Sequence, residues 1–171
     1  MIDRVLIDTL KLRARDFAIR WKDTIRKYPH LKQYNDMDDG TLIEEDMPFY
    51  PMLSRTLDRG LDRSLVGDFF VKKAKDRMHQ GFPISEVIFA LSLNQSLIIE
   101  YLMTEFAPEN PMRMYQSMGA LTRIAEFCLL GSFYISKGFL EETYTHMSNH
   151  DDVSEELLKK YFKDDFFFKQ E

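Results

Sequence analysis

The sequence contains one cysteine, Cys128, among its 171 residues. One thiol cannot form an intramolecular disulfide, so the composition favours a reducing environment. Charged residues at Asp3, Arg4 and Asp8 interrupt the start of the chain, which is unlike the apolar stretch of a signal peptide. No uncharged apolar run reaches the ~20 residues of a membrane span. We therefore expect a cytoplasmic protein that is not embedded in a membrane.

The chain also lacks an excess of positive charge. It has 23 Lys and Arg against 28 Asp and Glu, a formal net charge of −5, which argues against nucleic acid as a partner. Residues 1–34 are an exception, with nine Lys or Arg and four Asp or Glu, which leaves a net −10 for the rest. We interpret this basic stretch as a solvated helix face or one that meets an acidic neighbour.

No catalytic motif is present, and no acid and base are brought together by their spacing. The composition, 44% hydrophobic and 30% charged, is that of an ordinary globular protein, and the length suits one domain with a real core. The sequence therefore predicts a globular protein that is not an enzyme.

Glycine and proline are scarce, with seven and six residues, and they separate stretches of helical periodicity. These stretches predict an all-α bundle of about five to six helices in residues 1–140, followed by a C-terminal helical arm in residues 141–171. The expected helices cover residues 1–28, a short helix beginning at Thr41, about 51–59, 62–80, 81–106, 112–139 and about 152–168.

The stretch Gly81–Phe106 is apolar around most of a helical circumference, which places it inside the bundle. Asn94 and Gln95 interrupt its apolar face. With Tyr101, which lies on the same broad face, they are the candidate ligand contacts, because a buried amide must satisfy its donors and acceptor. The alternative is a polar layer that sets the register between helices and is satisfied within the protein.

Residues 112–139 carry two apolar seams, which indicate two sets of neighbours. One seam consists of Met114, Met118, Leu121, Ala125, Cys128, Ser132, Ile135 and Phe139. The other consists of Ala120, Ile124, Phe127, Gly131, Tyr134 and Gly138. Glycine costs a helix ~1 kcal/mol relative to alanine, so close packing against another backbone is the expected compensation. Cys128 lies on a seam and is expected to be a buried structural thiol.

Two histidine patterns raise the alternative of a cofactor-binding bundle. Glu142, His146 and His150 are four residues apart, so a continuous helix would align them as ligands of a divalent metal, whereas a helix end before Asn149 would leave them solvated. A haem protein would need an axial histidine on a helix wall, but His79 lies at an expected helix end. We therefore expect no cofactor.

The end of the chain carries an aromatic run. Three consecutive aromatic residues cannot all face one core, so some of them are expected to bury against a partner subunit or another protein. The candidate partner-binding residues are Phe162, Phe166, Phe167 and Phe168.

The order of several residues resembles a known family. The segments that carry the resemblance are WKDTIRKYPHLKQY, with Trp21, Ile25, Pro29, Leu31 and Tyr34, and RMHQGFPISEVIFAL, with Arg77, Gly81 and Glu86. Over roughly residues 10–140 the chain is similar to the RsbT co-antagonist RsbRD-type N-terminal domain, which is found ahead of STAS domains and some bacterial histidine kinases.

The resemblance implies an all-helical, non-enzymatic sensor module of the bacterial stress response, often dimeric and globin-like in arrangement without haem. No STAS, kinase or other output domain is recognised in the 171 residues. A signal is therefore expected to leave through a partner such as a kinase or an anti-sigma pathway component. The resulting interpretation is a cytoplasmic signalling module that forms a homodimer, and the alternative is a bundle that binds haem or a metal.

Overall fold

The structure is a computed structural model that describes residues 2–150 and 152–162. Helices account for its regular structure and no strand occurs in these residues, so the all-α prediction is confirmed. The helices are α1 (Arg4–Leu12), α2 (Ala14–Ile25), α3 (Lys32–Asp36), α4 (Asp39–Asp46), α5 (Phe49–Arg59), α6 (Arg63–His79), α7 (Ile84–Tyr101), α8 (Pro111–Ser148) and α9 (Glu155–Tyr161). The π-helical turn η1 (Leu102–Phe106) and the 3-10 turn η2 (Ala107–Glu109) follow α7.

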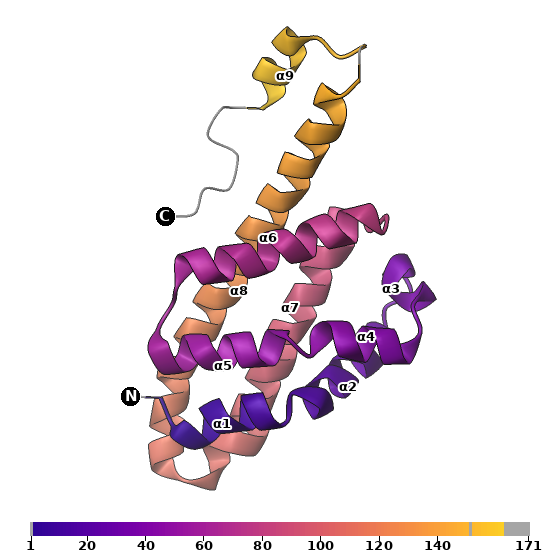
Figure 1. Cartoon of the computed structure of the whole chain (residues 1–171). Coiled ribbons are helices and arrows are strands. Elements are labelled where there is room, and N and C mark those ends of the chain that lie inside the picture. Colours follow the sequence, from indigo (N-terminus) through magenta and orange to yellow (C-terminus); the bar gives the residue numbers. More distant parts are fainter. Residues whose placement is uncertain (1, 151, 163–171) are drawn as a thin grey trace.

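The helices form two layers (Figure 1). The front layer contains α1 with α2, α4 with α5, and α6, while α7 and α8 lie behind it. Contacts of α6 and α5 with α8, and of α2 with α7, join the layers. The C-terminal part of α8 extends beyond α6, and α9 folds back against it.

The N-terminal helix is broken, which the sequence did not predict. Residues 1–28 were expected to form one helix, but the backbone at Arg13 leaves the helical region and separates α1 from α2. The two halves pack on different partners, α1 on α5 and α2 on α4 and α7. The predicted apolar positions are nevertheless buried, because each half keeps its own apolar face: Leu6, Leu10, Phe17, Trp21 and Ile25.

The predicted breaks at proline and glycine are confirmed. Met47 and Pro48 separate α4 from α5 although both keep helical φ and ψ angles, and α5 begins at Phe49, two residues before the predicted start at about Pro51. Gly60 and Gly81 end α5 and α6 with φ angles of 89° and 83°, a conformation that glycine adopts without a steric penalty.

The apolar stretch predicted from Gly81 is the central helix of the bundle. Most of this stretch, from Ile84 to Tyr101, forms α7, which contacts α8, α2 and α6. The chain then continues as the π-helical turn η1 to Phe106. The predicted helix therefore reaches Phe106, but it is α-helical only as far as Tyr101.

Helix α8 is longer than predicted and only one of its two seams is fully covered. The seam from Ala120 to Gly138 is buried along its whole length. The other seam is buried at Cys128, Ile135 and Phe139, whereas Met114 and Met118 are 58% and 67% exposed. The expectation of neighbours along both seams is therefore wrong for the first half of this helix within the described chain.

Glycines bring α6 and α8 close together. A Cβ atom on Gly138 would lie 2.8 Å from the Cβ of Ala74 and 3.0 Å from the carbonyl oxygen of Val71. A Cβ atom on Gly131 would lie 2.7 Å from the ring of Phe70. The loss of helix propensity at these positions is thus offset by close helix packing, as predicted.

Two stretches, Ile84–Glu109 and Pro111–Ser148, are long and apolar enough to cross a membrane by length and composition. Core helices of soluble proteins meet the same criterion, and half of the most apolar window of the first stretch is buried within the bundle. The cytoplasmic location therefore stays a prediction.

The predicted division into a bundle and a C-terminal arm coincides with no helix end and stays a prediction. The predicted boundary at residues 140 and 141 falls inside α8, which continues to Ser148. A short helix, α9, then ends at Tyr161 instead of continuing to Phe168. Residues 163–171 lie outside the described part of the chain.

Candidate functional site

A group of three polar side chains lies in the core, centred on Asn94 of α7. Its Oδ1 atom lies 2.7 Å from the hydroxyl oxygen of Tyr50, and its Nδ2 atom lies 2.6 Å from Oδ1 of Asp46. The Tyr50 hydroxyl also lies 2.7 Å from Oδ2 of Asp46, so the three side chains form a closed ring. None of them is more than 2% exposed, so water does not compete for these contacts.

Counting hydrogens shows that the Asp46 carboxyl must be protonated for this ring to close. Three contacts need three hydrogens, of which the tyrosine hydroxyl supplies one and the Asn94 amide supplies one. The third can come only from a protonated Asp46. The count is the same if the Asn94 amide is rotated by 180°, because the amide then donates to Tyr50 and Asp46 must donate to the Asn94 oxygen.

The electrostatic surroundings agree with this proton count. Burial raises the pKa of Asp46, because a charged carboxylate loses its hydration in the core. Burial likewise raises the pKa of the Tyr50 hydroxyl, and the nearby Asp46 adds to that increase. Both shifts favour the neutral forms of the two groups, which is the direction that the proton count requires.

Two cations of α6 lie beside this ring. Lys73 is partly exposed as a whole residue, yet burial lowers the pKa of its amino group, with the charge of Asp46 acting in the opposite direction. The two observations agree because Lys73 lines both an open groove and a small internal void next to Asn94. Its carbon chain thus connects the surface with the polar core.

Arg77 is 2% exposed and is held on all sides. It forms an ion pair with Glu45 and donates a hydrogen bond of 2.9 Å to Oε1 of Gln80. Its guanidinium lies over the rings of Tyr34 and Phe82, at 5.1 and 4.6 Å from their centroids. A buried charge with these partners fixes the end of α6 against α4 and the turn before α7.

An open groove of about 590 Å³ runs between α4 and α6. Its lining includes Lys72, Lys73 and Arg77, opposed by Glu45 and Asp76. Because both signs of charge line it and Arg77 is already paired, the groove does not select an anion or a cation.

The three candidate ligand contacts are not brought together. Asn94 belongs to the polar ring, whereas Gln95 is half-buried on another side of α7. Tyr101 is buried near the end of α7, where its ring meets Phe17 edge-on at 5.0 Å between centroids. The described contacts of Asn94 match the alternative interpretation, a polar layer satisfied within the protein, and a ligand at these residues stays a prediction.

Two of the three predicted metal ligands meet a histidine from another helix. Glu142 and His146 lie one turn apart on α8, and His79 ends α6 beside them. These three residues offer ligand atoms that all lie within 4.8 Å of one another. His150 follows the end of α8 at Ser148 and is not part of the group, because the helix does not continue far enough to align it.

The predicted partner contacts at the C-terminus are covered only in part. Phe162 follows α9, and its ring lies 5.5 Å from that of Tyr144 of α8. Phe166, Phe167 and Phe168 lie outside the described residues, so their role stays a prediction.

The outward side of α8 is the largest set of exposed apolar side chains on one described helix. Large apolar residues there are between 47% and 75% exposed, namely Met112, Met114, Tyr115, Met118, Leu129, Phe133 and Leu140. A continuous line along this side has steps of three and four residues, which keeps it on one helix face. We call this line the α8 stripe: Tyr115, Met118, Thr122, Ala125, Leu129, Phe133, Ser136 and Leu140.

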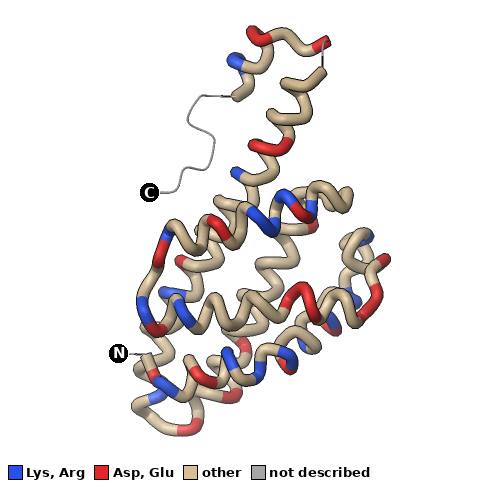
Figure 2. The backbone as a smooth tube through the Cα atoms, in the orientation of Figure 1, with Lys and Arg blue, Asp and Glu red and all other residues tan. Residues whose placement is uncertain are grey.

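Charge is sparse along this part of the molecule. Figure 2 shows that Lys, Arg, Asp and Glu concentrate on the front-layer helices and are few on α7 and the middle of α8. Between Met114 and Ser136 the only charged residues of α8 are Arg123 and Glu126, one turn apart at the edge of the α8 stripe.

No protein family matches this chain, and neither a curated protein nor a solved structure matches it.

Sequence reasoning missed Asp46 and His79 as members of these groups. The spacing of Asp46 and Tyr50 by four residues was visible, but Pro48 lies between them and argued against a shared helix face. His79 is far from Glu142 in the sequence, and only the packing of α6 on α8 brings the two together.

Proposed function

We propose that this protein is a regulatory helical module that acts through protein contacts and forms a homodimer along the α8 stripe. The observation that carries the proposal is the exposure of a long apolar line on a helix whose other side forms the core. Exposed apolar surface of this extent marks interaction sites in soluble proteins. The hydrogen-bonded ring around Asn94 supports a structural role for the polar core instead of a catalytic one.

The α8 stripe is complementary to itself in an antiparallel pair. If the twofold axis passes between Thr122 and Ala125, these small residues lie at the closest approach of the two helices. Met118 then faces the partner's Leu129, and Tyr115 faces the partner's Phe133. The part of the stripe that pairs in this register, from Tyr115 to Phe133, spans ~27 Å at the rise of an α-helix.

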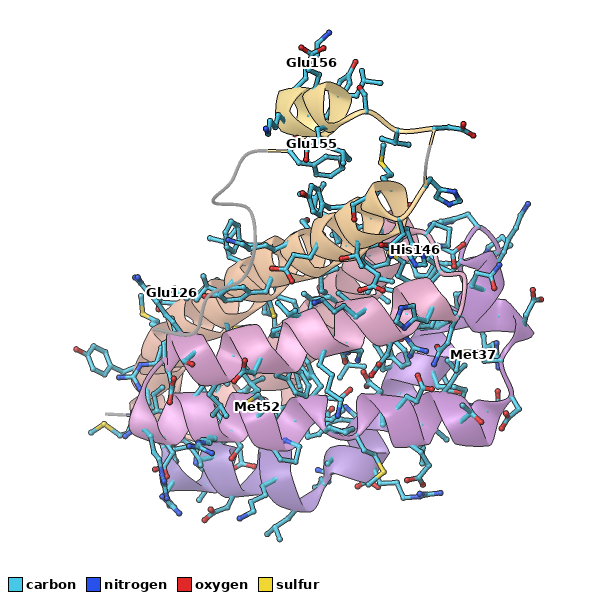
Figure 3. All side chains as sticks on the ribbon, turned by 45° about the horizontal axis from the view of Figure 1, so that its top comes forward. Met37, Met52, Glu126, His146, Glu155 and Glu156 are labelled. Atoms are coloured by element: carbon cyan, nitrogen blue, oxygen red, sulfur yellow. The ribbon has the colours of Figure 1, made fainter. Side chains whose placement is uncertain are left out.

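Charge also favours an antiparallel arrangement with a second copy. Residues on the same flank of two antiparallel helices meet, so Glu126 approaches the partner's Arg123 twice in the dimer. Arg123 also donates a 2.9 Å hydrogen bond to the carbonyl oxygen of Leu57 in its own chain. Figure 3 labels Glu126, on the outer part of α8. A lipid surface would instead favour basic residues around the apolar line, and Arg123 is the only cation next to its middle.

The dimer is tested by measuring the mass of the protein in solution by light scattering. We expect twice the chain mass of 20.3 kDa for the unmodified protein. Leu129→Lys should give a monomer with an unchanged helical circular dichroism signal. Leu12→Lys is the matched control, since Leu12 is 82% exposed on α1, away from the α8 stripe, and this variant should remain a dimer.

A monomer at ~100 µM would overturn the dimer, since a specific interface of standard size binds more tightly than that. If the protein is a monomer that co-floats with anionic vesicles, and Leu129→Lys abolishes this binding, the stripe is a membrane-binding surface. Equal dimerisation of Leu129→Lys and the unmodified chain would place the interface elsewhere on the molecule.

The signalling role of the module rests on the resemblance described above. Its partner would be a kinase or an anti-sigma pathway component of the bacterial stress response, and a helix shift in the dimer would carry the signal. The test is co-purification with the products of neighbouring genes. Capture of a kinase or an anti-sigma factor that Leu129→Lys loses supports the role, and a metabolic enzyme as the sole partner contradicts it.

A further inference from the structure

His79, Glu142 and His146 form a compact group where the end of α6 reaches the overhanging part of α8. The Nε2 atom of His79 lies 2.6 Å from Oε1 of Glu142. The Nε2 atom of His146 lies 3.8 Å from the same oxygen. Figure 3 shows His146 on α8, and the ring of His79 is 6.4 Å away between centroids.

These separations are close to those of a coordinated ion. Zinc lies about 2.0–2.2 Å from nitrogen and oxygen ligands, so neighbouring ligand atoms of a tetrahedral site are about 3.3 Å apart. The ligand atoms of His79 and Glu142 would need to move apart by less than an ångström. His146 would need to move toward both, since its ligand atom is 3.8 Å from Oε1 of Glu142 and within 4.8 Å of that of His79. Both imidazoles are exposed, 57% and 62% of the side chain, so rotation about their side-chain bonds can supply these shifts.

The backbone that carries the three ligands is fixed by packing. Gly138 lies one turn before Glu142 and sits directly against Ala74 and Val71 of α6. Glu141, next to Glu142, forms a 2.9 Å ion pair with Lys75 of α6. Glu142 itself is only 16% exposed at its side chain, so its position is restricted. The ligands therefore come from two helices whose relative position does not depend on an ion.

We propose that His79, Glu142 and His146 bind a divalent transition metal of the zinc type. Two imidazoles and one carboxylate suit zinc, cobalt or iron(II), whereas magnesium and calcium prefer a shell of oxygen ligands. Three protein ligands leave a fourth position for water or another small donor. His79 also lines the groove between α4 and α6, so this open position faces solvent at the end of that groove.

The metal would clamp the overhang of α8 to the end of α6. The site shares no residue with the α8 stripe, so it does not rest on the proposed dimer. A Leu129→Lys monomer should bind the metal as the unmodified chain does.

The test is titration of the chelator-treated full chain with Co²⁺, followed by displacement with Zn²⁺. We expect one ion per chain, a visible absorption band of four- or five-coordinate Co²⁺, and its loss on addition of Zn²⁺. His79→Ala and His146→Ala should each weaken metal binding by at least about tenfold. Removing a residue that only hydrogen-bonds to a metal ligand already costs about that much affinity. His150→Ala is the matched control and should bind as the unmodified chain does.

Thermal unfolding gives a second readout that does not depend on colour. Zn²⁺ should raise the unfolding midpoint of the unmodified chain and of His150→Ala, but not that of His79→Ala or Glu142→Gln. Absence of a stoichiometric ion would overturn the proposal. So would equal binding by His79→Ala and the unmodified chain, because the α6 ligand would then be unnecessary.

Discussion

At the scale of single residues, the ring of Asp46, Tyr50 and Asn94 shows how a bundle can hold a carboxyl group in its core. When it is protonated, the carboxyl is a neutral donor and acceptor and does not need a counter-ion at bonding distance. Each member fixes the rotamers of the other two, and the ring joins α4, α5 and α7.

Asp46→Asn should preserve the fold and remove a pH dependence. An amide can accept from Asn94 and donate to Tyr50, as the protonated carboxyl does. Because the pKa of Asp46 is raised on folding, only the folded state keeps the proton between the ordinary ~3.9 and the folded value, and stability falls as pH rises through that window. Relative to the unmodified chain, the free energy of unfolding of Asp46→Asn should rise by about 1.4 kcal/mol for each pH unit within that window.

Urea unfolding from pH 4 to 8 measures this difference. Asp46→Ala is the control, since it leaves Tyr50 and Asn94 with only each other as partners and should cost about 1–3 kcal/mol at every pH. If Asp46→Asn were as destabilised as Asp46→Ala at pH 7, the carboxyl would be ionised and held by Lys73.

Cys128 should not react with a thiol reagent while the protein is folded. It is 2% exposed, and burial raises the pKa of its thiol to about 12, so little thiolate forms at pH 8. The rate of modification by Ellman's reagent should follow the rate of unfolding and become fast in urea. Rapid modification without denaturant would contradict the burial of this residue.

The residue types at these positions could be read from the sequence, but their partners could not. Asn94 stood out because it interrupts an apolar face, and the polar-layer interpretation needed no structure. Asp46 looked like one acid among several before Pro48, and Lys73 looked like a surface lysine of α6. Only the packing of α4 and α6 around α7 brings these groups into one network.

At the scale of helices, glycine positions on α8 have different roles. Gly138 contacts backbone atoms of α6, while nothing lies within 4 Å of a Cβ atom added to Gly119. The first allows two helices to approach, and the second only weakens the helix.

Substituting alanine at the two positions should therefore have opposite effects. Gly138→Ala should destabilise the protein by about 1–3 kcal/mol, because the backbone of Val71 cannot move aside easily. Gly119→Ala should stabilise it by up to ~1 kcal/mol through helix propensity alone. Denaturant unfolding measures both, and a neutral Gly138→Ala would mean that α6 is free to move away from α8.

Helix ends were predictable where glycine or proline marks them, as at Gly60, Gly81 and Pro48. The break at Arg13 was not, because no helix breaker lies there and the turn arises from the different partners of α1 and α2. The two seams of α8 were also visible in the sequence. Periodicity identifies an apolar face, but it does not show whether that face is covered by the same chain.

At the scale of the whole molecule, the fold is concentrated in the bundle, and α9, the described helix that follows α8, adds little to its core. Leu158 is the only buried residue of α9. A chain that ends at His150 should therefore unfold at most about 2–4 °C below the full chain, the shift expected for ~1 kcal/mol in a protein of this size. Leu158→Ala in the full chain is the control and should give a shift of similar size. A much lower midpoint for the shortened chain would mean that residues beyond Leu158 contribute to the core.

No proline or irregular turn interrupts α8 after its first residue, so its 38 residues form one continuous, stiff helix ~57 Å long. The α8 stripe occupies this helix from Tyr115 to Leu140, and Glu142 and His146 follow directly after it. A torsion about the helix axis in one region is therefore transmitted to the other, since nothing between them can absorb it. An ion that joins the overhang to the end of α6 would therefore fix the direction in which the whole stripe faces, without any change in the polar core.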